Sequence, residues 1–151
     1  MLFTCYLRAG VVYIPTMARR VSEPVYTAIE PVAVVYLTDI ENVRRALLET
    51  MARKNPLIPQ PDAQALRAPP LLLKYAKAKS WSAFFRNAST WSITEDDGAF
   101  KIISYRKHLG RHWQEDSTRE IQFPTGTTRD DVVGPVAGLV GIEGGVVSEV
   151  I

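Results

Sequence analysis

Cysteine and long apolar runs are scarce in this sequence, and their scarcity excludes several classes of protein. The 151 residues include a single cysteine, Cys5, so no internal disulfide can form, and we expect a reducing, cytoplasmic environment. No apolar run approaches the roughly 18 residues that a membrane-spanning helix needs, so no membrane partner is expected. Tyrosine, proline and threonine interrupt the apolar stretch after Arg8, which is not typical of a signal peptide.

A strong excess of one charge is also missing. The chain carries 18 basic and 16 acidic side chains, a formal net charge of +2, whereas nucleic-acid-binding domains are usually strongly basic. The C-terminal glycines, in "GPVAGLVGIEGG", match neither glycine-rich phosphate-binding motif, and we expect no cofactor. With 46% hydrophobic residues, a chain of this length can bury one core, and we predict a single domain over residues 1–151.

Strand and helix signals alternate in the first half of the chain. The runs "LFTCYL" and "VVYI" predict two edge strands, and the apolar stretch Val32 to Leu37 predicts a central strand covered on both faces. A helix is predicted from Thr38, which forms a capping box with Glu41, to Lys54. Its apolar face consists of Ile40, Val43, Leu47 and Met51.

Residues 56–70 hold five of the ten prolines, which predicts an ordered extended connector inside the domain. The segment "LLLKY", residues 71–75, predicts a strand, and "SWSAFF", residues 80–85, predicts a short helix or turn.

The stretch "STWSITEDDGAFKIISYRKH", residues 89–108, predicts a β-hairpin. Asp97 and Gly98 suit the positive φ angles of a two-residue type I′ turn. Counting outward from this turn gives three cross-strand pairs, Ile93 with Ile102, Glu95 with Phe100 and Trp91 with Ser104. The alternation places Trp91, Ile93, Phe100 and Ile102 on the core face.

The last third of the chain predicts one more strand and a helix. "REIQF" adds a strand with Ile121 and Phe123 inward, and Thr127 or Thr128 caps a helix whose first turn carries acidic residues. Gly134-Pro135 interrupts this pattern, so no structure is predicted past Val133. The whole pattern predicts an α+β fold, a mainly antiparallel twisted sheet with two or three helices packed on it.

Two histidines are the first candidates for chemistry. On a helix His108 and His112 would share one face as metal ligands, but Gly110 lies between them in a predicted loop and no third ligand is nearby. We therefore expect no metal site and no catalytic residue. A hydrolase that uses His108 or His112 with Glu115 or Asp116 stays an alternative, whereas nothing local marks Cys5 as an activated nucleophile.

Basic and aromatic residues interleave between residues 67 and 86, and no acidic residue occurs between Asp62 and Glu95. The basic residues are Arg67, Lys74, Lys77, Lys79 and Arg86, and the aromatic residues are Tyr75, Trp81, Phe84 and Phe85. Such a stretch can bind single-stranded nucleic acid through phosphate contacts and base stacking. It can also form an electropositive protein-binding face, or a solvated edge whose aromatic side chains belong to the core.

Four stretches of the sequence carry a resemblance that covers about residues 29–133. They are "IEPVAVVYLTDIENVRRALLE", "NPLIPQP", "LLKYAKAKSWSAFFRNASTWSITEDDGAFKIISYRKH" and "RHWQEDSTREIQFPTGTTRDDV". Together they resemble the immunity proteins of contact-dependent growth inhibition systems, the CdiI family. Lys79-Ser80-Trp81, the Trp91 strand and "FPTGTT" are the most specific parts. Members of that family end in a regular amphipathic helix, whereas Gly134-Pro135 and "GLVGIEGGVVSEVI" follow here.

The resemblance implies a protein without enzymatic activity. Such a protein binds the C-terminal toxin domain of its own system's CdiA effector, often a nuclease, and neutralises it inside the producing bacterium. The alternative from the residue pattern is a small single-stranded nucleic-acid-binding module that uses residues 67–86.

The resemblance carries over no fixed interface, because each immunity protein recognises its own toxin and rejects others. We expect the hairpin tip and the loop that follows it to bind the toxin, since Tyr, Trp and Arg anchor interfaces and carboxylates can imitate a nucleic-acid substrate. The residues are Glu95, Asp96, Tyr105, Arg106, Lys107, His108, Arg111, His112, Trp113, Glu115 and Asp116. The alternative is a solvated loop whose Trp113 plugs the edge of the sheet.

Overall fold

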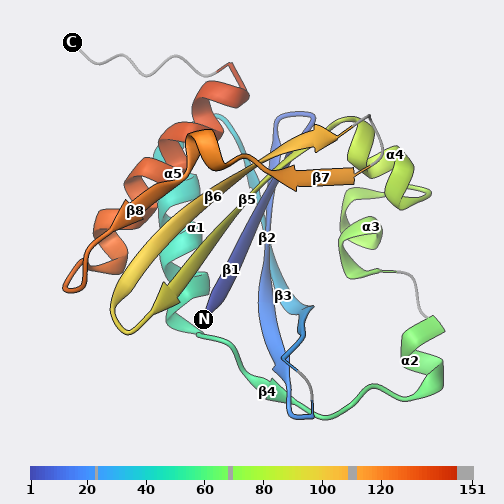
Figure 1. Cartoon of the computed structure of the whole chain (residues 1–151). Helices are drawn as coiled ribbons and strands as arrows, with labels where there is room; N and C mark the ends of the chain where they lie inside the picture. Colours follow the sequence, from blue (N-terminus) through green and yellow to red (C-terminus); the bar gives the residue numbers. More distant parts are fainter. Residues whose placement is uncertain (23, 68–69, 109–111, 146–151) are drawn as a thin grey trace.

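A mainly antiparallel sheet forms the centre of the structure (Figure 1). The computed structural model describes residues 1–22, 24–67, 70–108 and 112–145. Six strands follow one another in the order β3-β2-β1-β5-β6-β7; they are β1 (Leu2–Arg8), β2 (Val11–Arg20), β3 (Tyr26–Tyr36), β5 (Ala88–Asp96), β6 (Ala99–His108) and β7 (His112–Glu115). Two short strands, β4 (Leu57–Ile58) and β8 (Ile121–Phe123), pair with β2 and β6. The predicted α+β fold is confirmed.

Helices pack on both faces of this sheet (Figure 1). On one face, α1 (Ile40–Ala52) and α5 (Arg129–Glu143) bury the main core, which includes Phe3, Trp91 and Ile102. On the other face, α3 (Leu71–Ala76) and α4 (Trp81–Arg86) cover a smaller core. Helix α2 (Ala63–Arg67) and a 3-10 turn at Ser117–Arg119 are the remaining helical elements of the described ranges. Of the two helices that build the smaller core, the sequence predicted α4 as a short helix or turn and did not predict α3.

The β5–β6 hairpin has the predicted register. Asp97 and Gly98 have φ angles of 49° and 78°, as a type I′ turn requires. The structure pairs Ile93 with Ile102, Glu95 with Phe100 and Trp91 with Ser104. The predicted core face is also confirmed, because Trp91, Ile93, Phe100 and Ile102 are each at most 4% exposed. Strand β8 adds Ile121 and Phe123 beside this core, as predicted.

The strand order differs from the prediction at the N-terminal side. Strands β1 and β2, both predicted at an edge, lie inside the sheet, with β1 between β2 and β5 and β2 between β3 and β1. Strand β3, which contains most of the run predicted as central, lies at the end of the order, and its Val34 and Tyr36 are 44% and 70% exposed. An apolar run indicates burial and not the number of neighbouring strands, and β1 obtains its second neighbour from a segment 80 or more residues away.

Helix α1 has the predicted apolar face but a different N-cap. Val43, Leu47 and Met51 are at most 1% exposed. The cap is Asp39, whose carboxylate accepts a hydrogen bond of 3.0 Å from the amide of Glu41; the predicted capping box at Thr38 is wrong. Aspartate is preferred over threonine at this position, and the helix begins one residue later because of it.

Residues 71–75 form a helix and not the predicted strand. In α3, Leu72, Leu73 and Ala76 are buried, a helical spacing, and leucine is a better helix former than strand former. The segment predicted as a short helix or turn is helix α4, with Ser80 as its N-cap. The prediction of an extended connector without elements over residues 56–70 is wrong in part, because this segment holds the short strand β4 and the helix α2.

Helix α5 continues through Gly134-Pro135 to Glu143. Thr128 is the N-cap, as predicted, and forms a capping box with Asp131. Its buried side chains on either side of the proline are Val132, Val133, Val136, Ala137 and Val140, and their burial offsets the backbone hydrogen bond that Pro135 removes. None of the helices in the described ranges combines the length and apolar character needed to cross a membrane.

Candidate protein-binding surface

The acidic hairpin tip is anchored on one side and free on the other. Glu95 forms an ion pair of 3.2 Å with Arg129 of α5, and its carbonyl oxygen accepts a hydrogen bond of 2.6 Å from the N-terminal amine of Met1. These contacts hold the hairpin against α5 and the N-terminus. Asp96 and Asp97 are exposed, so of the two acidic residues predicted to contact a partner here, Asp96 is the accessible one.

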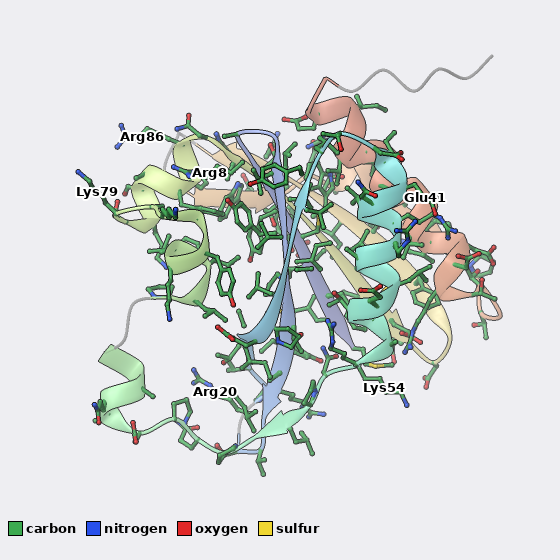
Figure 2. The ribbon with its side chains drawn as sticks, turned by 180° about the vertical axis from the view of Figure 1, so that it is seen from behind. Arg8, Arg20, Glu41, Lys54, Lys79 and Arg86 are labelled. Carbon is green, nitrogen blue, oxygen red and sulfur yellow. The ribbon has the colours of Figure 1, made fainter. Side chains whose placement is uncertain are left out.

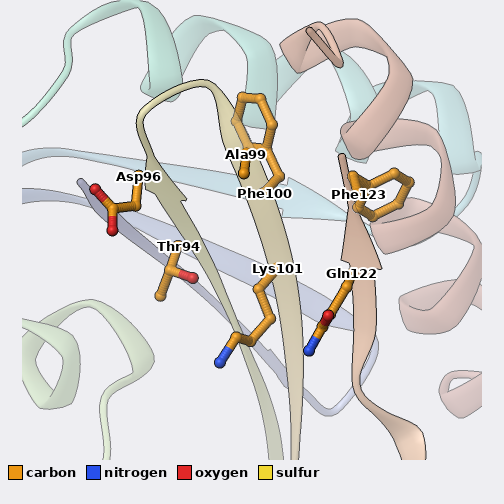
Figure 3. A pocket seen from close by; sticks show the side chains of 7 residues that line it. All are labelled: Thr94, Asp96, Ala99, Phe100, Lys101, Gln122 and Phe123. Atoms are coloured by element: carbon orange, nitrogen blue, oxygen red, sulfur yellow. The ribbon is translucent and has the colours of Figure 1, made fainter. Parts of the chain in front are cut away.

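A hollow of about 390 Å³ lies beside this tip, between β5, β6 and β8 (Figure 3). Thr94, Lys101 and Gln122 are neighbours across the three strands, and Figure 3 shows their side chains on the same side of the sheet. Lys101 forms an ion pair of 3.3 Å with Glu120, and the carboxyl of Glu120 has a pKa below its usual range because of hydrogen bonds from Gln122 and Lys101. These groups place hydrogen-bond donors and acceptors on the face of the sheet beside the tip.

Tyr105 and Asp116 make contacts within the protein. The Tyr105 hydroxyl lies 3.1 Å from the Ser92 hydroxyl. Asp116 accepts hydrogen bonds from Thr118 and pairs with Arg119 at 2.9 Å. The Thr118 hydroxyl first, and then Arg119, hold the pKa of the Asp116 carboxyl below its usual range. A carboxylate stabilised as an anion in this way suits a structural cap better than an acid-base catalyst.

Trp113 belongs to an aromatic cluster and is only partly exposed. Its ring centroid lies 4.8 Å from that of Phe85 and 6.2 Å from that of Phe84, both in edge-on geometry. Tyr6 of β1 completes the cluster at 6.0 Å. The position agrees with the alternative in which Trp113 plugs the edge of the sheet, so most of its indole surface is used within the protein.

The rest of the predicted surface lies at the β6–β7 end of the sheet. Arg106, Lys107 and Glu115 are exposed, and the ammonium group of Lys107 donates to the carbonyl of Arg86 in α4. The backbones of His108 and His112 pair where β6 meets β7, and nothing further of these two residues is described. Arg111 lies outside the described residues. Strand β6 has 10 residues, so about 30 Å separates this end from the hairpin tip.

The basic and aromatic stretch is divided between core and surface. Phe84 and Phe85 are 0% and 5% exposed and belong to the interior around α4, whereas Trp81 is 43% exposed. Figure 2 shows Lys79 and Arg86 on α4 and the segment before it, with Arg8 of β1 at the same end of the sheet. Sequence reasoning named these residues but had no means of placing α4 against the end of β6, because the two meet only through tertiary packing.

Nucleophile and metal chemistry find little support in the described part of the chain. Cys5 is 2% exposed, and burial raises the pKa of its thiol to about 12, so the reactive thiolate is not formed near neutral pH. Within the described residues no three His, Cys, Asp or Glu side chains are grouped so that they could hold a metal ion.

The sequence matches no protein-family model and no curated protein. Solved structures with a similar fold do exist. A protein of unknown function from Neisseria meningitidis is similar with a TM-score of 0.63 and 14% sequence identity, over 94% of this chain and 93% of that chain. A chain of a CdiA-CT/CdiI toxin and immunity complex from Yersinia pseudotuberculosis is similar with a TM-score of 0.61 and 8% identity, over 95% of each chain. Both likenesses show a shared fold that extends over almost the whole protein.

Proposed function

We propose that this protein is a cytoplasmic immunity protein, which binds the C-terminal toxin domain of its own system's CdiA effector and neutralises it without catalysis. The observation that carries the proposal is the shared fold, over 95% of both chains, with a chain of a toxin and immunity complex. The sequence resemblance to the CdiI family points to the same role.

The proposed toxin-binding surface consists of the hairpin tip and the β6–β7 end. Asp96 supplies accessible negative charge at the tip, and Arg106, Lys107 and Glu115 supply accessible charge at the other end. A standard interface buries about 800 Å² on each partner, an area about 30 Å across, so one partner can touch both ends of β6. The internal contacts of Glu95, Tyr105, Trp113 and Asp116 then hold the surface in shape.

We propose further that the toxin is a nuclease whose substrate groove receives the acidic tip. A groove that binds nucleic acid is electropositive, and the carboxylates of Asp96 and Asp97 project from the turn between β5 and β6. Carboxylates presented on a stiff hairpin can occupy phosphate positions without being hydrolysed.

The nucleic-acid-binding alternative is supported by the exposed basic residues near α4, but its stacking platform is reduced. Of the four aromatic residues in that stretch, Phe84 and Phe85 are buried, and Tyr75 donates a hydrogen bond of 2.8 Å to Glu30. Successive bases need several accessible rings, and Trp81 alone does not provide them.

Binding to the toxin domain encoded next to this chain is the direct test. Calorimetric titration should give a nanomolar or lower Kd, which corresponds to a binding free energy on the order of −12 kcal/mol. We expect such tight binding because a few free toxin molecules can be lethal. Coexpression of the protein should also protect cells from the toxin. Micromolar or absent binding to the toxin domain, together with salt-sensitive binding to a single-stranded oligonucleotide, would instead support the alternative.

Three single variants test the proposed surface, namely Tyr105→Ala, Arg111→Ala and Glu115→Ala. After each is shown to fold, dissociation from the toxin domain is measured, and at least one should cost about 2 kcal/mol or more. Glu49→Ala is the matched control, because Glu49 is exposed on α1 across the sheet. If all three variants bind as tightly as this control, the interface lies elsewhere.

A further inference from the structure

A basic surface surrounds α4. Its members are Lys77, Lys79, Arg86 and Lys107, which are all exposed, together with the exposed Trp81; we call these five residues the α4 surface. The ion pairs found among the described residues involve none of these four cations. Lys107 instead donates to the Arg86 carbonyl and lies over the ring of Phe85 at 5.6 Å.

Arg8 strengthens the positive field from beneath. Its guanidinium donates a hydrogen bond of 3.1 Å to the carbonyl of Ala76 at the end of α3, and it lies 5.9 Å from the Phe84 ring centroid. Its Nε atom is buried and has no partner in the described structure. A partly buried guanidinium without a carboxylate is poorly screened by solvent, so its field reaches the surface above it.

Carboxylates on neighbouring elements form no ion pair with these cations among the described residues. Glu30 accepts the hydrogen bond from Tyr75, and Glu143, which lines a hollow with Lys107, accepts one of 3.0 Å from the Ser89 hydroxyl. The chain has no acidic residue between Asp62 and Glu95, so α3, α4 and the turn between them contribute basic charge alone.

Trp81 adds an apolar anchor to this surface. The residue is 43% exposed, yet its ring is supported by Phe84, with the centroids 5.6 Å apart in edge-on geometry. The helix that carries it begins at Ser80, whose hydroxyl accepts a hydrogen bond of 3.1 Å from the amide of Ala83. A partly exposed indole on a firm support loses little entropy on binding, and Trp and Arg are the residues most enriched in interface hot spots.

We infer that the α4 surface binds an acidic patch of a protein partner, with Trp81 seated in an apolar depression of that patch. The inference rests on the proposed function, which makes the partner the toxin domain. A groove that binds nucleic acid is itself basic and would repel these cations, so the contact lies outside the toxin's substrate groove. A single accessible ring and a net charge of only +2 favour a protein partner over a nucleic acid.

The test uses the toxin domain encoded beside this chain and two sets of matched variants. Lys79→Glu with Arg86→Glu reverses two charges on the α4 surface, and Arg45→Glu with Lys54→Glu reverses two exposed charges on and just after α1. The first pair should slow association at low ionic strength by about tenfold or more, whereas the second pair should leave it within about twofold. Trp81→Ala should speed dissociation by about tenfold or more, because the loss of an anchor acts mainly on the dissociation rate.

Each outcome decides something different. If the parent protein binds the toxin domain tightly and all of these variants behave like the control pair, the inference is overturned while the proposed function stands. If the parent protein does not bind the toxin domain, the proposed function fails and the inference falls with it. A salt-sensitive complex with a single-stranded oligoribonucleotide that the Lys79→Glu, Arg86→Glu pair abolishes would assign the α4 surface to nucleic acid and overturn the inference.

Discussion

Single residues have different roles here according to their depth, and the tryptophans illustrate this. Trp91 is 3% exposed in the main core, and Trp81 is 43% exposed on α4. Trp113 lies between these extremes in the aromatic cluster around Phe85. The same side chain therefore serves the core, a surface and the edge of the sheet, and only the environment of each decides what its removal costs.

Trp91→Ala should lower the free energy of unfolding by about 3–5 kcal/mol, because it empties a large site between the sheet and its helices. Trp81→Ala is the control with the same chemical change, and it should cost less than about 1 kcal/mol. Denaturant unfolding measures both. A loss below about 1 kcal/mol for Trp91→Ala would mean that the hairpin face is not part of the core.

Cys5 should make the protein less stable in alkali. Burial raises the pKa of its thiol to about 12, whereas an unfolded cysteine has a pKa of about 8.5. Between these values the folded state keeps a proton that the unfolded state releases, so the free energy of unfolding falls as pH rises, by at most about 1.4 kcal/mol per pH unit. Below the unfolded pKa the contribution is fully present.

Comparison with Cys5→Ala isolates this effect, because burial also raises the pKa of the neighbouring Tyr6. The stability difference between the parent and the variant should narrow when unfolding is measured at about pH 10 instead of about pH 8. If the stability difference between the parent and Cys5→Ala does not change with pH, the thiol ionises in the folded protein over the same pH range as in the unfolded chain.

At the scale of elements, residues that are neighbours in the chain determine the register of the β5–β6 hairpin and the residues at which helices begin. The Asp97-Gly98 turn sets the register of β5 and β6, and the capping box at Thr128 begins α5. Helix α5 tolerates glycine and proline in its interior because its buried side chains outweigh their cost. Gly141 is useful there, since a Cβ atom at this position would lie 2.9 Å from the Ile40 side chain of α1.

Two glycine substitutions should therefore change the free energy of unfolding in opposite directions. Gly98→Ala should lower the free energy of unfolding by roughly 1 kcal/mol, because φ is +78° there and the added methyl group has only ordinary contacts. Gly138→Ala should raise it by about 0.5–1 kcal/mol, because the position is helical and open space surrounds it. Thermal unfolding of both variants checks the pair, and a stabilising Gly98→Ala would contradict the assigned turn.

On the scale of the whole molecule, opposite charges lie at opposite ends of β6. Asp96 and Asp97 are exposed at the hairpin tip, and the α4 surface, which includes Lys107 of β6, lies at the far end. Because the net charge is only +2, electrostatic attraction to a partner depends on how the charges are distributed over the two ends of β6 and not on the net charge. A partner with the reverse arrangement is oriented before contact.

Toxin binding should consequently depend on salt through the association rate. Raising the ionic strength from low to physiological values should slow association severalfold and leave the dissociation rate nearly unchanged, because exposed charges steer the encounter and are screened. Stopped-flow measurements with the toxin domain separate the two rates. A salt effect confined to dissociation would place the charges in a buried pair instead.

Local signals in the sequence determined several features correctly. The Asp97-Gly98 turn set the hairpin register and its core face, the spacing of Val43, Leu47 and Met51 set the buried side of α1, and Thr128 set the start of α5. In each case the residues that matter lie within a turn or a short hairpin, so geometry is decided by neighbours in the chain. In the misassigned segment at residues 71–75, three consecutive leucines show neither the helical nor the strand period, and their preference for helices was the only local signal.

Tertiary structure alone decided the rest. The position of β1 in the middle of the sheet depends on its pairing with β5, 80 or more residues away, and a run of apolar residues carries no information about such partners. The same holds for the basic candidate surface: Phe84 and Phe85 of α4 pack against Trp113 of β7, and this brings Arg86 beside Lys107 of β6. Sequence determines which side chains are available, and packing between distant segments determines which of them share a surface.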